Sequence, residues 1–275
     1  MDYKIVADSC CDMTPELREK LGVVNVPMIM TLEDKHFIDS EDLDLSVFMR
    51  EMKECKSGAK SAAPSPELYR KEFDGTHESF AITVSSKLSG SYSSAVLGAD
   101  ISSNKENVHV FDSKSASAGE ILIAVKIRDM INSGLKRVNI IENVETFISK
   151  MKTYFILQNL DNLMKNGRLN KIIGKLVTAL NIKPLLGDDG NGNITLSSYS
   201  RGQNQALERL ASTIEKSGKK TEGETMVITH CNNESFAERL LSEIKRRYNF
   251  KEILVVPTRG LSSMYADDKG IVIAF

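Results

Sequence analysis

The sequence predicts a two-domain α/β protein, in which a three-layer α/β/α domain with a mostly parallel sheet precedes a domain with a mixed sheet. The chain has 275 residues, which is too long for most single hydrophobic cores. Short apolar runs alternate with helical patterns in the first half, as in right-handed βαβ units. In the second half a Gly/Asp/Asn-rich turn joins two extended runs, which indicates antiparallel pairing. We therefore expect a first domain over residues 1–148 and a second over residues 149–275.

Strands and helices alternate along the first half. Two helix starts are strong, at Thr14-Pro15-Glu16 and at Ser65-Pro66-Glu67, because a hydroxyl cap precedes proline and an acid in each. Apolar residues on one face predict a helix over residues 45–55. Residues 31–39 suit an exposed turn or hairpin, and residues 56–65 a polar loop. The other expected elements are strands over residues 4–7, 23–30, 79–84 and 108–111, and helices over residues 15–22, 91–102 and 117–131.

The second half of the sequence mixes a hairpin pattern with alternating strands and helices. The turn over residues 187–193 joins extended runs at 182–186 and 194–199 into a hairpin. Residues 160–180 are helical with a break at Asn166-Gly167. The other expected elements are helices over residues 143–152, 203–217 and 235–248, and strands over residues 154–157, 225–229, 253–256 and 271–275.

Residues 83–95 hold six serines and one threonine. An apolar strand leads into a loop with one glycine, and a helical pattern follows. A strand end facing a helix N-terminus gathers free N–H groups and hydroxyls, and the helix dipole favours negative charge there. Ligands of parallel sheets bind beyond the carboxyl ends of the strands, where Asp8-Ser9 and Asp112-Ser113 also fall. The stretch predicts either an anion site or an ordinary serine-capped helix, for which one hydroxyl suffices.

Composition excludes several classes of function. The net charge is −1 and tryptophan is absent, which argues against a nucleic acid or an anionic membrane as the main partner. No apolar run reaches the roughly 18 residues that span a membrane, and the first residues lack the pattern of a secretion signal, so we expect a cytoplasmic protein. Cys10, Cys11 and Cys231 with His230 allow a weak zinc interpretation, but reduced thiols are the simpler one.

Two enzymatic interpretations stay open at this point. Asp8, Asp12 and Asp112 follow strands and would suit Mg²⁺ in a phosphoryl-transfer enzyme, although capping of loops explains the first two more simply. A serine with His109 or His230 would suit a hydrolase, but the G-x-S-x-G motif is absent. The Walker loop G-x-x-x-x-G-K-[ST] is absent too, which argues against ATP use by this chain alone.

Several motifs, taken in their order along the chain, resemble the DegV family of bacterial lipid-binding proteins. Each motif is weak alone, but their joint order is specific and covers nearly the whole chain. The segments that carry the resemblance are D-S-C-C-D at residues 8–12, K-S-A-A-P-S-P at 60–66, S-S-K-L-S-G-S-Y at 85–92, D-S at 112–113, N-G-R-L at 166–169, I-K-P-L-L at 182–186 and Y-S-R at 199–201.

The resemblance implies two α/β domains that hold one long-chain fatty acid in a tunnel between them. Some family members are the binding subunit of bacterial fatty acid kinase. They present the carboxylate to a separate ATP-using kinase, which forms an acyl phosphate, and have no known catalytic activity of their own. We accordingly expect a long-chain fatty acid as ligand, a kinase as partner, no cofactor, no metal and no nucleic acid, and leave room for transient membrane contact. A different amphiphile, such as an isoprenoid or sterol acid, is the alternative ligand.

The resemblance places the fatty-acid carboxylate on the serine-rich loop. Ser89 matches the family's L-S-G serine and is our first choice for the carboxylate ligand, with helix capping as its alternative role. Ser61 matches a loop threonine that supplies a second donor. Ser86 and Gly90 complete the expected carboxylate site, Gly90 because it allows close approach of the backbone.

Two arginines match family arginines near the head group and the partner surface. These are Arg168 and Arg201, whose guanidinium forks suit a carboxylate or an acyl phosphate. The usual alternative for either is a solvated charge.

The chain departs from the family pattern at two places near the head group. Ala62 and Ala63 replace serine and glutamine, so one expected polar group is missing. Many relatives carry a histidine at about the position of Ala266. Here the neighbouring Tyr265 can donate a neutral hydrogen bond but carries no positive charge at neutral pH, unless it serves only in packing.

Overall fold

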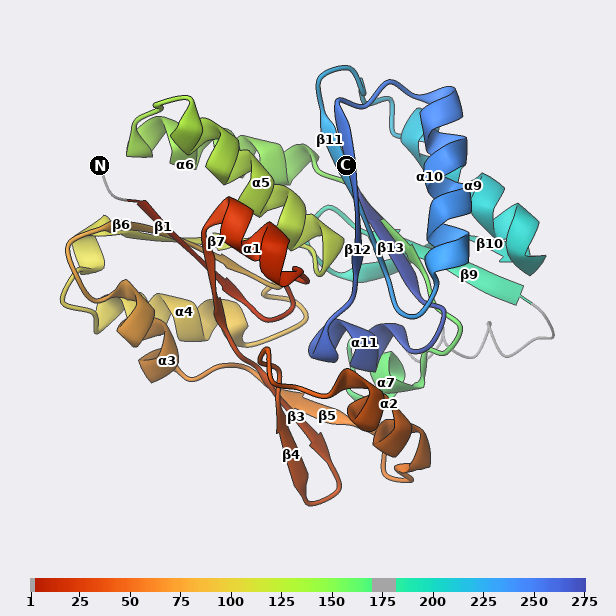
Figure 1. Cartoon of the computed structure of the whole chain (residues 1–275), viewed down its shortest axis with the longest axis horizontal. Coiled ribbons are helices and arrows are strands. Elements are labelled where there is room, and N and C mark those ends of the chain that lie inside the picture. The colour runs from red at the N-terminus through yellow and green to blue at the C-terminus, as the bar shows by residue number, and fades with distance from the viewer. Residues whose placement is uncertain (1–2, 170–181) are drawn as a thin grey trace.

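The chain folds into layers of helices and β-sheets (Figure 1). The computed structural model describes residues 3–169 and 182–275. Within these residues the strands form a four-stranded parallel sheet, a six-stranded mixed sheet and a three-stranded antiparallel sheet. This arrangement confirms the predicted α/β fold, in which a parallel sheet precedes a mixed one. Of the helix predicted over residues 160–180, the part over residues 170–180 lies outside the described residues.

The parallel sheet lies between two layers of helices. Its strands, in pairing order, are β2 (Val23–Val26), β1 (Tyr3–Asp8), β6 (Glu78–Thr83) and β7 (Val108–Asp112). The helices are α1 (Pro15–Leu21), α5 (Ala118–Asn132) and α6 (Arg137–Lys150) on one face, and α3 (Pro66–Phe73) and α4 (Ser91–Asp100) on the other. Successive residues of a strand face opposite sides, so Ile5 packs with α5 while Val6 packs with α3.

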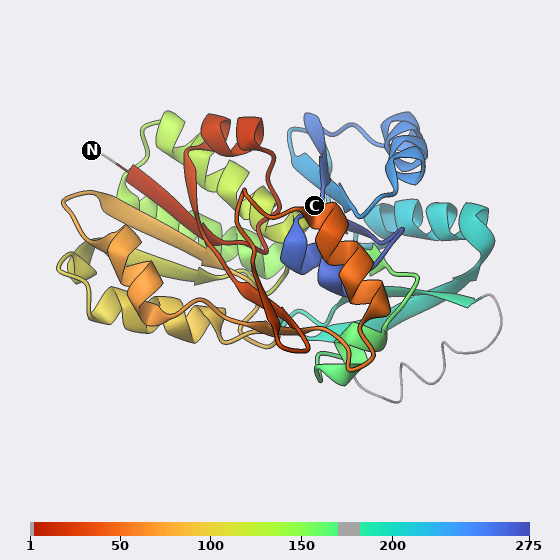
Figure 2. The same cartoon turned by 60° about the horizontal axis from the view of Figure 1, so that its bottom comes forward.

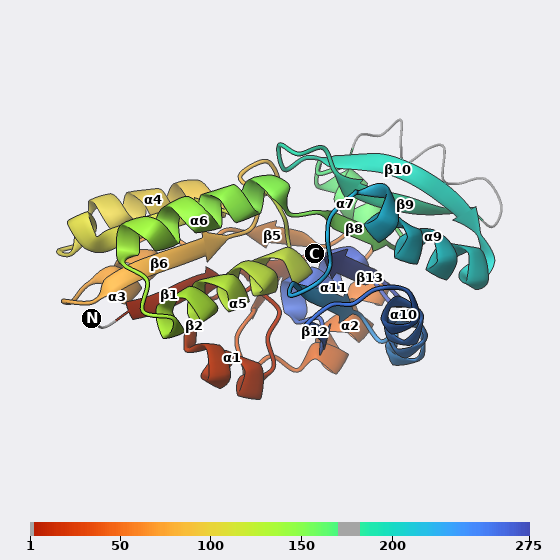
Figure 3. The ribbon, with the colours of Figure 1, turned by 90° about the horizontal axis from the view of Figure 1, so that it is seen from above.

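The mixed sheet shares one helix with the parallel sheet. Its strands, in pairing order, are β10 (Ile194–Arg201), β9 (Ile182–Asp188), β8 (Thr153–Ile156), β13 (Ile271–Ala274), β11 (Thr225–His230) and β12 (Glu252–Pro257). Helices α9 (Gly202–Lys216) and α10 (Glu234–Arg247) pack on it, while Val227 and Ala274 join the core around α5. Figure 3 shows α5 reaching from the first sheet toward the second. Because α5 contacts both sheets, the domain boundary at residues 148 and 149 remains a prediction.

The predicted helix caps at Thr14 and Ser65 are confirmed. The Thr14 hydroxyl accepts from the N–H of Leu17 at 3.2 Å, and the Ser65 hydroxyl accepts from that of Leu68 at 3.4 Å. Gly22 ends α1 with a left-handed φ of 61°, a conformation that glycine adopts at little cost. These short-range signals were sufficient because each cap and its partner are three residues apart.

The chain between β2 and α3 differs from the prediction. The strand predicted over residues 23–30 ends at Val26, because Pro27 has no N–H to donate to a ladder. It resumes as β3 (Ile29–Leu32), which forms a hairpin with β4 (Lys35–Ile38), within the turn or hairpin expected over residues 31–39. β5 (Lys60–Ala62) pairs with β3 inside what the sequence suggested was a polar loop.

Four further elements complete the described chain, and the first three are α2 (Leu45–Glu54), α7 (Asp161–Lys165) and a 3₁₀ turn, η1 (Lys105–Asn107). A fourth, α11 (Gly260–Ala266), was not predicted. Its first N–H groups bond to Asp39, at 3.0 Å from Gly260 and 2.9 Å from Leu261, so its cap lies far away in sequence. Figure 2 shows α2 over α11, which brings the small antiparallel sheet and α2 against the second half of the chain.

Candidate functional site

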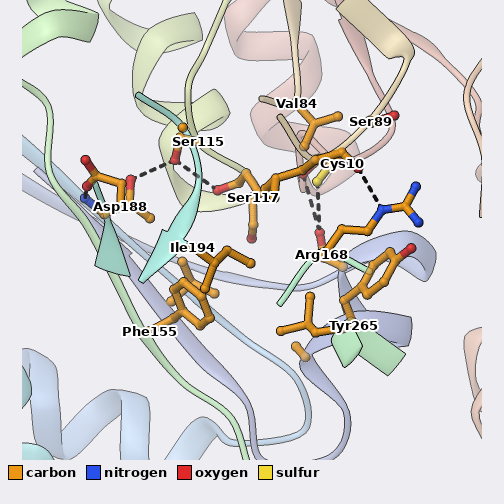
Figure 4. Close-up of a pocket in the computed structure, with 18 of the residues that line it drawn as sticks. Cys10, Val84, Ser89, Ser115, Ser117, Phe155, Arg168, Asp188, Ile194 and Tyr265 are labelled. Carbon is orange, nitrogen blue, oxygen red and sulfur yellow. Dashed lines mark hydrogen bonds between the residues drawn. The ribbon is translucent and has the colours of Figure 1, made fainter. Parts of the chain in front are cut away.

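A cavity opens beyond the carboxyl ends of β6 and β7, between the loops that follow them and the mixed sheet (Figure 4). Its volume is about 120 Å³, on the order of ten times the ~10–15 Å³ that one water requires. Apolar side chains make most of its wall: Met28, Val84, Leu88, Phe155, Leu157, Leu163, Ile194, Leu261 and Val272. Figure 4 shows Ser89, Arg168 and Tyr265 on one side and Ser115 and Asp188 on the other.

Ser89 lines the cavity from the loop between β6 and α4. Its hydroxyl oxygen accepts from the N–H of Ser91 at 3.2 Å. The residue at the N-cap position of α4 is Gly90, which makes no side-chain cap bond. Within the described chain the Ser89 O–H has no acceptor, so it is free to donate to a ligand while its oxygen holds the helix start. The two roles considered for Ser89 are therefore compatible.

Ser61 and Tyr265 meet at the same side of the cavity. The Ser61 hydroxyl, on β5, lies 2.9 Å from the Tyr265 hydroxyl, on α11. Burial raises the pKa of Tyr265, against smaller lowering effects from the Ser61 hydrogen bond and the Arg168 charge. Tyr265 is thus a neutral donor at physiological pH.

Arg168 lies beside these hydroxyls. The preceding Gly167 has a φ of 74°, which turns the chain after α7. The Arg168 Nε donates to the carbonyl oxygen of Leu88 at 2.9 Å, and Nη1 donates to the carbonyl of Asn166. Arg168 therefore fixes the loop next to Ser89 and brings a positive charge to the cavity, while Nη2 has no acceptor among the described residues.

Three predicted site residues do not line the cavity. Ser86 is exposed, and its hydroxyl donates to Asp112 Oδ2 at 2.5 Å while its N–H donates to Oδ1 at 3.0 Å. Arg201 is exposed at the end of β10, where its N–H donates to Gln205. Gly90 is exposed with a φ of −74°, which any residue can adopt. The places of Ser86 and Gly90 in a carboxylate site therefore stay predictions that the lining of the cavity does not support, and Gly90 has no conformational need for glycine.

The aspartates after the strands hold loops together. Asp8 accepts from the N–H groups of Cys10 and Val84, and Asp112 from Ser86. Asp12 accepts from the Ser117 hydroxyl and the Arg259 N–H, both at 2.5 Å, and burial raises its pKa to about 7. Among the described residues these three carboxylates do not gather around one point, so the magnesium interpretation has no geometric support.

The histidines and cysteines also do not gather into a site among the described residues. His109 lies 3.4 Å from Glu145 on the outer surface, and the Nδ1 of His230 accepts from the N–H of Asn233 at 3.3 Å. Neither histidine has a serine partner within the described residues. Nor do Cys10, Cys11 and Cys231 converge on His230 there, so neither a triad nor the suggested zinc site is present.

Several cavity residues were missed by sequence analysis. Ser115 and Ser117 follow the Asp112-Ser113 strand end that had been noted, and Cys10 follows Asp8-Ser9. Asn193 and Asp188 flank the tip of the β9–β10 hairpin, where the Ser85 hydroxyl donates to the carbonyl of Gly192 at 2.8 Å. Strand-end positions therefore signalled part of the lining, whereas the hairpin tip reaches it only through tertiary packing.

The whole chain matches one family of proteins. The family model described as "Uncharacterised protein, DegV family" matches residues 2–275. The chain belongs to the DegV family. A DegV domain-containing protein of Streptococcus gordonii is 34% identical over 281 residues, which cover 100% of this chain and 99% of that protein. No helix in the described part of the chain is long and apolar enough to cross a bilayer.

Solved DegV structures share the fold over nearly full length. A DegV family protein from Ruminococcus gnavus, refined with vaccenic acid, is 36% identical with a TM-score of 0.94, covering 100% of this chain and 99% of that one. The fatty acid kinase B3 protein of Streptococcus pneumoniae, loaded with linoleic acid, is 33% identical with a TM-score of 0.93 and the same coverage. A DegV family protein from Eubacterium eligens, loaded with heptadecanoic acid, is 25% identical with a TM-score of 0.92, covering 99% and 98% of the two chains.

Proposed function

We propose that this chain binds one long-chain fatty acid in the cavity and presents its carboxylate to a separate kinase subunit, which converts it to an acyl phosphate. One observation carries the proposal: an apolar cavity whose one side brings together Ser61, Ser89, Arg168 and Tyr265. Fatty acids in the related DegV structures and the kinase B3 protein among them support it.

The four polar residues would bind the carboxylate through two kinds of interaction. The Ser89 O–H and the Ser61–Tyr265 pair supply neutral donors, and Arg168 supplies charge through Nη2, which has no acceptor among the described residues. Of these four residues only Arg168 is a cation and none is a histidine, so the head-group site is weakly cationic. Orientation therefore comes mainly from hydroxyl hydrogen bonds.

The acyl chain should provide most of the affinity. Burying a sixteen-carbon chain supplies on the order of 10 kcal/mol gross at about 0.8 kcal/mol per methylene. Immobilisation of the ligand reduces this gain. The apolar wall, with Phe155, Leu157 and Met28, suits that chain.

The chemistry of activation belongs to the partner. A carboxylate oxygen attacks the γ-phosphorus of ATP, the new P–O bond gives the acyl phosphate, and ADP leaves. The residues of this chain hold and orient the nucleophile, and we assign none of them a catalytic role. Arg201, exposed and away from the cavity, is the candidate contact for the kinase.

Native mass spectrometry of the purified protein tests the proposal. We expect a mass excess of one fatty acid, or stoichiometric uptake of palmitate or oleate by delipidated protein. Incubation with ATP alone should yield no acyl phosphate, whereas addition of a bacterial fatty acid kinase subunit should yield it. A strictly apo protein that takes up neither acid would contradict the proposal, and an extracted isoprenoid or sterol acid would replace the ligand class.

A further inference from the structure

Glu120 is a fully buried carboxyl group whose near neighbours are another acid, Asp8, and the thiol of Cys10. It lies in the first turn of α5 with 0% exposure, and neither of its side-chain oxygens has a hydrogen-bond partner among the described residues. One carboxylate oxygen of Asp8, one of Glu120 and the Sγ of Cys10 all lie within 4.8 Å of one another. An ionised carboxylate in such a place would lose its hydration without compensation, next to a second acid.

Asp8 is the opposite case, because its carboxylate is well supplied with donors. It accepts from the N–H of Cys10 at 3.1 Å, from the N–H of Val84 at 2.9 Å and from the O–H of Ser91 at 2.5 Å. The Tyr69 hydroxyl lies 2.6 Å from the Ser91 oxygen and donates to it, since the Ser91 proton is already given to Asp8. Asp8 is therefore built to carry the charge, and Glu120 is not.

We propose that Glu120 stays protonated at neutral pH and that its O–H donates a hydrogen bond to the Asp8 carboxylate. The pair then carries one negative charge and positions the loop that bears Ser89. Val84 stands just before residues 85–90 and Ser91 just after them, so Asp8 ties both ends of this loop. The proposal deepens the proposed function, on which its positioning part rests.

The surroundings of the pair favour one shared proton. The titratable groups that face it are Cys10, Cys11 and Asp12 on the loop after β1, and Tyr69 on α3. None of them is a cation. Burial first, and then the Asp8 charge, raise the pKa of Glu120 well above its usual value, and burial raises that of Asp8. A bound divalent cation would be the other way to neutralise two acids, and the test separates the two.

The variant Glu120→Gln decides the proton question, because an amide can donate the same bond but cannot ionise. In the unfolded chain Glu120 loses its proton above about pH 4.3. In the folded protein it keeps the proton, so the stability it contributes is full below that pH and is lost as pH rises. Relative to Glu120→Gln, the unfolding equilibrium constant of the wild type should rise about tenfold per pH unit above that pH, for as long as the folded protein keeps the proton.

The exposed Glu142, also an acid on a helix of the first half, supplies the control. Glu142→Gln should show no such slope against the wild type. A flat difference between wild type and Glu120→Gln would overturn the proposal. So would a stoichiometric divalent metal, found by elemental analysis of the wild type and lost in Glu120→Gln. These measurements need no ligand, so they stand even if fatty-acid binding fails.

The positioning part has its own readout, the ratio of affinities for a fatty acid and for the alcohol of the same chain length. Glu120→Gln should preserve this ratio. Glu120→Leu, which offers Asp8 no donor, should lower it several-fold while leaving alcohol binding unchanged. Equal ratios in all three proteins would show that the pair supports the fold without positioning Ser89.

Discussion

The hydroxyl groups of Ser61 and Tyr265, 204 positions apart in the chain, lie 2.9 Å from each other at the side of the cavity that Arg168 and Ser89 also line. The bond joins β5 of the small antiparallel sheet to α11 of the second half. A carboxylate that accepts from both hydroxyls would take the place of this mutual bond. Residues on both halves of the chain thus meet at this side of the cavity.

Ser89→Ala should weaken fatty-acid binding by about 1–3 kcal/mol, the cost of leaving a buried charged acceptor without a donor. Titration with a fluorescent fatty acid measures the change. Ser93→Ala, at an exposed position of α4, is the matched control and should bind like the wild type. Unchanged affinity in Ser89→Ala would mean that its hydroxyl serves only the Ser91 N–H.

Tyr265→His should make binding depend on pH. A histidine near its usual pKa of about 6.5 becomes cationic as pH falls below that value, so affinity for the carboxylate should increase on acidification. Tyr265 itself stays neutral there, because burial raises its pKa. The measurement is the affinity of the variant relative to wild type at pH 5.5–8 (roughly the range in which histidine titrates). An unchanged relative affinity would place this side chain away from the head group.

Substitutions of Arg168 and Arg201 should affect different steps, fatty-acid binding for the first and phosphoryl transfer by the kinase for the second. Arg168→Lys should lower fatty-acid affinity, because an ammonium cannot hold the Leu88 carbonyl and reach a carboxylate at once. Arg201→Ala should bind fatty acid normally but slow acyl phosphate formation by the kinase. Direct binding and coupled kinase assays on both variants test this pair. A normal transfer rate in Arg201→Ala would remove that arginine from the partner surface.

Asp12 should make stability depend on pH. Its folded pKa of about 7 lies above the usual value near 3.9, so its contribution is full below about pH 4 and is lost as pH rises through about 7. Compared with Asp12→Asn, the wild type should lose on the order of a few kcal/mol of unfolding free energy across that window. Denaturant melts at several pH values measure it, and a constant difference would show that Asp12 stays ionised in the fold.

Local signals predicted the elements whose stabilising partners are close in sequence. The Thr14 and Ser65 caps act over three residues, and both helices start where expected. In contrast, α11 begins with no side-chain cap of its own, because Asp39 takes its N–H groups from the other half of the chain. α6 likewise starts at Arg137, before the predicted start at residue 143. This start was not predicted because Lys136, at the N-cap position, makes no side-chain cap bond. Helix propensity and local motifs contain no information about capping partners that are distant in the sequence.

The site was predictable to a similar degree. Ser89 lies where the strand–loop–helix pattern placed an anion site, and the cavity contains Ser61, Arg168 and Tyr265, which only the family resemblance had suggested. Ser86 is outside because Asp112, on the neighbouring strand, captures its hydroxyl. Which serine of a serine-rich loop faces a ligand depends on such cross-strand partners, and no spacing rule supplies them.

A crystal structure of the delipidated protein reloaded with palmitate tests the central claim most directly. We predict one palmitate, with its carboxylate within hydrogen-bond distance of the Ser89 and Ser61 hydroxyls and its chain against Phe155 and Leu157. Density for the acid elsewhere on the surface, or a carboxylate turned away from Ser89 with the chain outside the cavity, would contradict this account.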